Sequence, residues 1–234
     1  MFGLGRSSGG LDQKTEKKLL EDTTPPLKRY QYLSKFTENS KEEEVRAWYQ
    51  TNYQKVYKIF LDSLLALDAQ AKTSRSKLID TKDVLSLCNI LYALFKHARN
   101  IIQKKWQQRS IIHYLEVFLQ QGNVWTVKKK GFELLLLFLD IMQNEVDTKV
   151  IDLLMFTLKF EPFVEGTTVK LPTYDIRDIN EEEKLKIPQT SEKSSAAGPT
   201  EDESLQLFTM LFAFMKSSAD TFDFWWSFFK TRLA

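Results

Sequence analysis

The sequence predicts an all-α protein, an antiparallel array of helices joined by short turns. Apolar residues recur at spacings of three and four over most of the chain, which is the pattern of helices that bury one face. Strand-like alternation is weak and confined to TTVKLPTYDI, residues 167–176. These features are typical of an α-solenoid of the HEAT or armadillo type. A closed helical bundle would show similar stripes, and we find no exact sequence repeat that decides between the two.

Length and charge set the broad class. The chain has 234 residues, of which 43% are hydrophobic, enough to bury the core of one ordinary domain. Lys and Arg number 33 against 31 Asp and Glu, a net charge of +2. This balance gives no global electrostatic reason to expect nucleic acid or an anionic membrane as a partner, so such binding would need a local basic patch.

Cysteine content and hydropathy indicate in which cellular compartment the protein is expected. Cys88 is the only cysteine and lies in an apolar helical pattern, so we interpret it as a small buried hydrophobe. The longest purely apolar run, Leu134 to Leu139, is far shorter than the roughly 20 residues of a membrane-spanning helix. The N-terminal residues lack the apolar core of a signal peptide. We therefore expect a soluble protein of the cytoplasm, with the nucleus as the alternative.

Composition divides the chain into four segments. Residues 1–26 form a glycine-containing polar stretch, interpreted as a flexible leader, and residues 27–160 carry the helical pattern of a scaffold. Residues 161–203 contain four prolines and a serine-rich end, which predicts a largely disordered insert. Helical periodicity returns over 204–234.

The first half of the scaffold predicts three helices. A short helix is expected at 27–37, and a second begins after a cap at Asn39 or Ser40 and runs to about Ala69. Asp80 or Thr81 caps a third helix, expected to continue to Ile101 or Ile102. The expected core residues of the last two are Tyr49, Tyr53, Val56, Phe60, Leu64, Leu67, Val84, Leu87, Cys88, Leu91, Leu94, Phe95 and Ala98.

The second half predicts a helical pair around Gly122-Asn123, residues that tolerate the left-handed conformation ending a helix. The helix after this turn carries Lys128, Lys129 and Lys130, which fall mostly outside its apolar stripe and are interpreted as a solvated face. Gly131 lies on the stripe itself. Because glycine in a helix interior costs roughly 1 kcal/mol relative to alanine, we expect a close helix contact there. A further helix is expected at 149–160.

The last segment contains two apolar helical patterns. Leu205, Phe208, Leu211 or Phe212, and Met215 are expected to form one buried stripe. Beyond it, seven of the twelve residues 222–233 are apolar and spread around the helix, so both sides require burial. We interpret the chain as a fragment or short isoform of a longer array. The candidate protein-interaction residues are Phe222, Trp225, Trp226 and Phe229.

Chemistry-bearing motifs are not recognisable. Metal sites need clustered ligands, but His97, His113 and Cys88 lie on helices without ligand-pair spacing. Cys88 has no flanking nucleophile motif. We expect no catalytic residue, no metal and no cofactor.

Two lysine clusters form the candidate basic surface. Lys104, Lys105 and Arg109 precede one helix, and Lys128, Lys129 and Lys130 open the next. Nucleic-acid-binding proteins often interleave exposed aromatic residues with such charges. Trp106 and Trp125 are candidates, although packing is the more common role for tryptophans at these positions.

The stretch QKKWQQRSIIHYLEVFLQQGNVWTVKKKGFELLLLFLDIMQN, together with RAWYQTNYQKVYKIFLDSLL, resembles the N-terminal regions of Ral GTPase-activating protein α subunits, relatives of tuberin. The shared pattern is a Trp at a helix start, an apolar helix, a Gly-Asn turn, and a basic cluster followed by Gly. It ends in a Leu/Phe-rich helix. Here Trp106, Gly122-Asn123, Gly131 and Leu134 to Asn144 carry it. The resemblance covers residues 27–160 well, is weaker through the insert and resumes in the aromatic terminal segment.

This resemblance implies a regulator of a small GTPase. Proteins of the family stimulate GTP hydrolysis on Ral-type GTPases through a C-terminal domain that presents an asparagine to the nucleotide, and they act as large cytoplasmic α/β heterodimers. That domain is not in these 234 residues, so no catalytic residue is carried over. The chain would be a scaffold, with the β subunit as its partner.

Two alternatives stay open at this point. A helical adaptor unrelated to GTPases would also lack site motifs. A nucleic-acid or membrane-surface module would use the lysine clusters, and its binding would be strongest at low salt.

Overall fold

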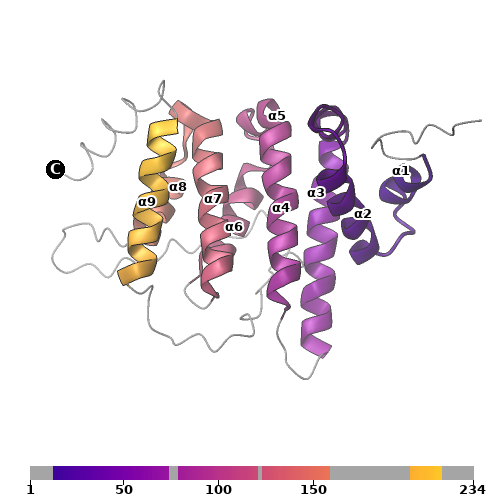
Figure 1. Cartoon of the computed structure of the whole chain (residues 1–234), viewed down its shortest axis with the longest axis horizontal. Helices are drawn as coiled ribbons and strands as arrows, with labels where there is room; N and C mark the ends of the chain where they lie inside the picture. The colour runs from indigo at the N-terminus through magenta and orange to yellow at the C-terminus, as the bar shows by residue number, and fades with distance from the viewer. Residues whose placement is uncertain (1–12, 74–78, 121–122, 159–200, 218–234) are drawn as a thin grey trace, which may run out of the picture. The chain divides into compact units, whose positions relative to one another are not determined.

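The computed structural model describes residues 13–73, 79–120, 123–158 and 201–217. Within these ranges the regular structure is entirely helical, without a strand (Figure 1), which confirms the all-α prediction. The chain divides into two compact units between Trp106 and Gln107. This division falls inside the stretch 27–160 that the sequence predicted as one scaffold.

The first unit is built on three helices that pack against one another. These are α2 (Pro26–Asn39), α3 (Glu42–Thr73) and α4 (Thr81–His97), with the short α5 (Arg99–Gln103) following α4. The core contains most of the residues expected from the sequence, including Tyr49, Val56, Phe60, Leu64, Leu67, Val84, Leu87, Leu91, Leu94, Phe95 and Ala98.

Helix α1 (Gln13–Leu20) lies in the segment that the sequence predicted as a flexible leader. Leu19 is completely buried, and the indole Nε1 of Trp48 on α3 donates to the Glu16 carboxylate over 3.0 Å. The leader prediction was therefore wrong for residues 13–20. Eight residues make too short a helix to persist alone, so its formation depends on contacts that are not local in sequence.

Helix ends in the first unit follow local chemistry. Pro26 starts α2, where its missing N–H costs nothing, and the Asp80 carboxylate accepts the Lys82 amide over 2.8 Å to cap α4. The predicted single helix from Asp80 to Ile102 was wrong. α4 ends at His97, and α5 restarts after Ala98, whose φ of −108° and ψ of 31° are not helical. Ala98 and Ile102 are nevertheless buried. The spacing of apolar residues therefore continues across the break, and the sequence pattern does not reveal it.

The second unit is arranged around one helix. It contains α6 (Gln108–Phe118), α7 (Trp125–Met142), a 3₁₀ turn at Gln143–Glu145, α8 (Thr148–Thr157) and α9 (Glu201–Ser217). α7 contacts α6, α8 and α9. Its buried residues occupy far more than one stripe and are Val127, Gly131, Phe132, Leu134, Leu135, Leu136, Phe138, Leu139, Ile141 and Met142.

The turn between α6 and α7 ends α6 through a side chain. Gly122 lies outside the described residues, but the buried Asn123 amide donates to the carbonyls of Val117 and Phe118 over 2.7 and 3.1 Å. The Val117 carbonyl also accepts from the Gln120 amide over 3.4 Å, so the Asn123 side chain adds to the backbone capping of this helix end. The expected role of Asn123 as a helix stop is met by its amide group rather than by a left-handed backbone.

Helix α9 buries a different stripe from the predicted one. Leu207, Leu211 and Met215 are buried, whereas Leu205 and Phe212 are 67% and 55% exposed. The prediction was right for Leu211 and Met215 and wrong for Leu205. Because α9 carries apolar residues on more than one side, periodicity alone does not select the side that packs.

Gly131 marks the close contact between α6 and α7 that the sequence predicted. A Cβ atom at this position would lie 2.8 Å from the Phe118 Cβ and 3.4 Å from the Leu119 side chain. The first distance is well inside van der Waals contact. Glycine therefore lets the two backbones approach at this point.

We expect Gly131→Leu to destabilise the chain by about 1 to 3 kcal/mol, because the added side chain overpacks the contact with α6. Thr126→Leu, at an exposed position of the same helix, is the control. The measurement is the midpoint and free energy of chemical unfolding. Equal stability of both variants and the parent chain would contradict the close contact.

Candidate interaction surfaces

The aromatic candidates Phe222, Trp225, Trp226 and Phe229 lie outside the described residues. Their role as a protein contact stays a prediction.

The lysine block on α7 is not uniformly solvated. Lys128 is 14% exposed, and its Nζ lies 3.6 Å from the carboxylate of Glu203 on α9, which is 20% exposed. Lys130 pairs with Glu133 one turn further along the helix over 2.7 Å. Lys129 is exposed. The expectation of a solvated face therefore holds for Lys129 and is corrected for Lys128, which links α7 to α9.

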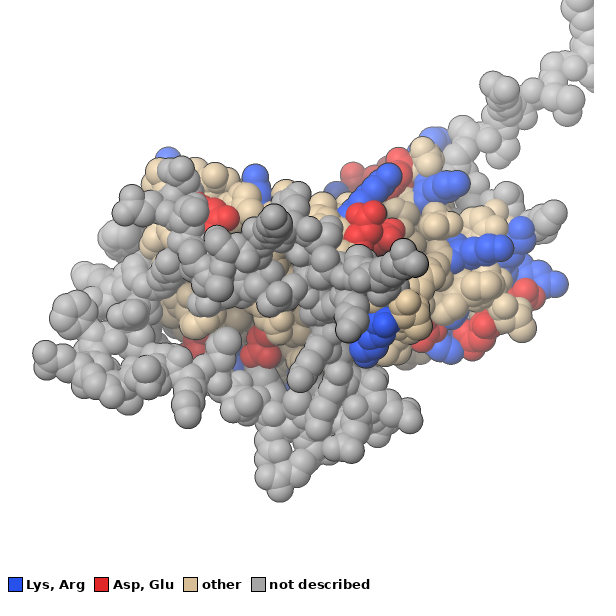
Figure 2. Space-filling model, turned by 90° about the horizontal axis from the view of Figure 1, so that it is seen from below, with Lys and Arg blue, Asp and Glu red and all other residues tan. Residues whose placement is uncertain are grey.

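The residues of the other basic cluster fall, in sequence, on both sides of the division between the two units. Lys104 and Lys105 belong to the first unit and Arg109 to the second, and all three are exposed. On the described part of the face that Figure 2 shows, Lys and Arg side chains are interspersed with Asp and Glu.

Trp106 has a packing role. Its ring lies edge-on to Tyr53 and Tyr57, with centroids 5.0 and 5.2 Å apart. The flanking residues Lys105 and Gln107 adopt left-handed backbone conformations, with φ of 63° and 52°. Such conformations are uncommon for residues other than glycine and persist where surrounding contacts enforce them. The Trp106 ring is engaged by two tyrosines, which does not favour the alternative of base stacking.

A buried guanidinium organises charge in the first unit. Arg29 on α2 is buried and donates to Asp62 on α3 over 2.7 Å and to Asp22 over 3.1 Å. Asp22 also accepts from Lys58 over 2.8 Å, and this hydrogen bond lowers the pKa of Asp22. The sequence analysis missed this network, because Arg29 and Asp62 are far apart in the chain and their approach has no local signature.

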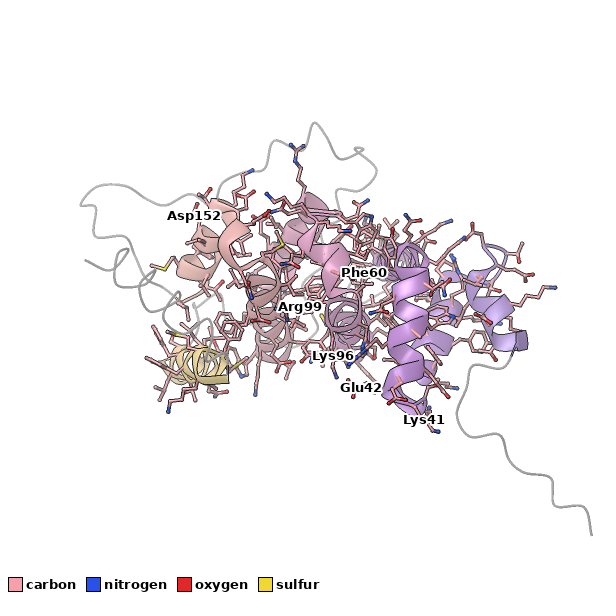
Figure 3. All side chains as sticks on the ribbon, turned by 90° about the horizontal axis from the view of Figure 1, so that it is seen from above. Lys41, Glu42, Phe60, Lys96, Arg99 and Asp152 are labelled. Carbon is pink, nitrogen blue, oxygen red and sulfur yellow. The ribbon has the colours of Figure 1, made fainter. Side chains whose placement is uncertain are left out.

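Further polar contacts join the three helices of the first unit. The Tyr30 hydroxyl on α2 donates to Asp83 on α4 over 2.8 Å, and burial together with this carboxylate raises the pKa of Tyr30 to about 12. Glu42, at the start of α3, pairs with Lys96 near the end of α4 over 2.8 Å (Figure 3). These contacts favour one register between the helices.

His97 lies at the same end of α4. It is buried edge-on against Tyr49, with centroids 5.7 Å apart, and its Nδ1 has no hydrogen-bond partner among the described residues. Burial lowers the pKa of His97, and it also lowers the pKa of His113 on α6. Both imidazoles are therefore held toward the neutral form.

The side chains that the sequence singled out for catalysis or metal binding do not come together in the described residues. Cys88 and His97 are both buried on α4, and His113 belongs to the other unit. Over the described ranges, no three His, Cys, Asp or Glu residues are grouped as a metal ion would require. None of the described helices combines the length and apolar character needed to cross a membrane.

Comparison with known proteins identifies the family. Residues 6–222 match the family model described as the RALGAPA1 N-terminal domain. The chain belongs to this family. The match covers both units and all described helices, so the RALGAPA1 N-terminal domain family includes α9 as well as the helices before residue 159.

Curated relatives are α subunits of Ral GTPase-activating proteins. Subunit alpha-2 of Mus musculus is 24% identical over 139 residues, which are 59% of this chain and 7% of that protein. Subunit alpha-1 is 23% identical over 132 residues in both Homo sapiens and Sus scrofa, or 56% of this chain. That stretch is 6% of the human protein and 39% of the pig protein. The chain thus matches only part of the length of these relatives, from 6% of the human protein to 39% of the pig protein. No solved structure matches it.

His97, which is buried, and His113, which is partly exposed, predict a pH dependence of stability. Because their folded-state pKa values lie below the ordinary 6.5, the unfolded chain binds more protons at mildly acidic pH. The free energy of unfolding should therefore fall as pH decreases through about 6.5 and level off below the folded-state values. Urea unfolding at pH 7.5 and 5.5 measures this, and His97→Phe should reduce the difference. An unchanged difference in His97→Phe would exclude His97 as a contributor.

The Lys128–Glu203 pair predicts coupling between α7 and α9. We expect Lys128→Ala and Glu203→Ala each to destabilise the chain, with a coupling energy of roughly 0.5 to 1 kcal/mol, because the pair is mostly but not fully covered. A double-mutant cycle measures the coupling, and hydrogen exchange in α9 reports where it acts. Lys129→Ala is the control. Additive effects of the two substitutions would show that the ion pair does not hold α9.

Proposed function

We propose that this chain is the non-catalytic N-terminal scaffold of a Ral-type GTPase-activating protein α subunit, supporting assembly or localisation of the activator complex in the cytoplasm. The observation that carries the proposal is the match of residues 6–222 to the RALGAPA1 N-terminal domain family. The named relatives are α subunits, and a subunit requires surfaces for other chains. Stimulation of the GTPase would belong to a domain outside this chain.

The architecture we propose is an α-solenoid of HEAT or armadillo type. In the first unit, α2 packs on α3 and α3 on α4, α2 also contacts α4, and α3 and α4 are joined by a short connection. In the second unit, α7 packs against helices on both sides of it in sequence. Layering of this kind supports a repeat-like array, which offers extended surfaces for partner chains.

The partner we propose is the β subunit, contacted through Phe222, Trp225, Trp226 and Phe229. Trp225, Trp226 and Phe229 follow Phe222 by three, four and seven positions. At helical spacing the four residues would share one face. Tryptophan and other large aromatic residues provide much of the binding energy at protein interfaces. This composition supports a protein contact in preference to a nucleic-acid contact.

Co-purification with the β subunit tests the proposal. The truncated chain should end at Ser217, because α9 buries Leu207, Leu211 and Met215, and a deletion that removes α9 would expose the core of the second unit. The point variant is Trp225→Ala with Trp226→Ala, and Leu65→Ala on α3, where an exposed apolar residue is lost, is the control.

We expect the full chain and the Leu65→Ala variant to retain the β subunit, and the truncated chain and the double-alanine variant to lose it. Circular dichroism and thermal unfolding of each variant separate loss of binding from loss of folding. Equal retention by all forms would remove the aromatic residues from the contact. Retention by none would contradict a β-subunit contact within this chain.

A further inference from the structure

Helices α1 and α2 together carry a cluster of lysines around one tyrosine. The two helices contact each other and lie at one end of the first unit (Figure 1). Lys28, Tyr32 and Lys35 follow one another on α2 at spacings of four and three, so their side chains leave the helix on one side. Lys18 of α1 reaches the same place, because its Nζ lies 5.5 Å from the centre of the Tyr32 ring. These four residues are the α1–α2 lysine patch.

The cations of the patch are accessible and are not neutralised by ion pairs. Lys28 and Lys35 are exposed, and Lys18 and Tyr32 are partly exposed. Among the described residues, no carboxylate lies within ion-pair distance of any of the three ammonium groups. The three charges are therefore available to an external anion.

The carboxylates between the two helices have cations of their own. Glu21 pairs with Lys17 over 3.6 Å. Asp22 pairs with Arg29 over 3.1 Å and with Lys58 over 2.8 Å. These pairs cancel the negative charge that lies closest to the patch along the chain.

The surplus positive charge of the chain resides in this region. Residues 13–39 contain six Lys and Arg against four Asp and Glu, a surplus of two. The whole chain has 33 Lys and Arg against 31 Asp and Glu, the same surplus, so the remaining residues are balanced. Attraction of an anionic surface by this chain is thus strongest at α1 and α2.

The composition of the patch favours an extended anionic surface over a single phosphate group or a base edge. Lysine carries a hydrated point charge on a flexible stem, whereas arginine provides the planar fork that binds phosphates and bases with two hydrogen bonds. The arginine of α2, Arg29, is buried against Asp22 and Asp62 and does not join the patch. Tyr32 has an apolar ring and a polar tip, the character of residues at membrane interfaces, and Lys18 lies over its ring where a stacked base would need room.

We propose that the α1–α2 lysine patch is a docking surface for a membrane leaflet rich in anionic phospholipid, with its three lysines near the headgroups and Tyr32 between them. Each lysine close to such a surface strengthens binding about fivefold, so three lysines provide a weak, reversible attraction that decreases with salt. The patch orients the chain on the leaflet and adds to other contacts. The inference rests on the proposed role in localisation, whereas co-purification with the β subunit tests a different contact, so either experiment can fail alone.

Vesicle sedimentation with the full chain tests the docking surface. The vesicles contain phosphatidylcholine alone or with about 30% phosphatidylserine, and binding is measured at low and at high salt. The test variant combines Lys18→Gln, Lys28→Gln and Lys35→Gln. The control variant removes the same net charge from three exposed lysines outside the patch, through Lys82→Gln, Lys104→Gln and Lys129→Gln.

We expect the parent chain and the control variant to bind phosphatidylserine vesicles at low salt, and the test variant to bind about a hundredfold more weakly. Absence of phosphatidylserine-dependent binding by the parent chain at low salt would overturn the proposal. Equal losses in the two variants would also overturn it, because the attraction would then follow net charge alone. Tighter binding of the parent chain to a single-stranded oligonucleotide, lost in the test variant, would replace the membrane by nucleic acid as the occupant.

Lysine acetylation in the parent chain tests the same contact without substitutions. Phosphatidylserine vesicles should slow acetylation of Lys28 and Lys35 severalfold, because the headgroups shield their ammonium groups, and should leave Lys82 and Lys104 unchanged. Mass analysis of peptides gives the rate at each lysine. Equal protection of Lys28 and Lys82, or protection of neither, would contradict the proposal.

Discussion

The burial of α7 on more than half of its circumference is the constraint on which the second unit depends. Leu134, Leu135 and Leu136 are consecutive and all buried, and successive helical residues point in directions about 100° apart, so no single neighbour covers them. α6 and α8 adjoin α7 in sequence, but α9 follows only after residues 159–200. The need to cover the remaining side of α7 gives a physical reason why a helix so distant in the chain packs there.

In the first unit, the arrangement of the helices depends on the buried charge of Arg29 rather than on one apolar helix. A guanidinium as buried as that of Arg29 carries a large desolvation cost, which nearby carboxylates offset only when they are held in place. Asp62 holds it from α3, and Asp22 holds it from the chain just before α2. The same network therefore ties the connection after α1 to α3. It favours the position in which Leu19 is buried and Glu16 reaches Trp48.

The charged and the apolar surfaces of this chain suit different uses. Cationic side chains such as Lys58, Lys96 and Lys128 pair with carboxylates of other elements, and these pairs align helices more than they attract a polyanion. Membership of the RALGAPA1 N-terminal domain family is consistent with such a helical platform. An apolar face such as that of α9 is the type of surface that protein contacts use, because burying it yields hydrophobic stabilisation without the desolvation cost of charged groups.

Local patterns in the sequence determined the helical class, most helix positions, the cap at Asp80 and the close contact at Gly131, because each depends on residues within a few turns. The resemblance carried by Trp106 to Asn144 also sufficed for the family. Tertiary structure alone decided the break at Ala98, the docking of α1, the Arg29 network and the side of α9 that packs. In these cases helical periodicity permits more than one arrangement. The choice is made by partners distant in the chain, such as Asp62 for Arg29 and Lys128 for Glu203, whose approach exists only after folding.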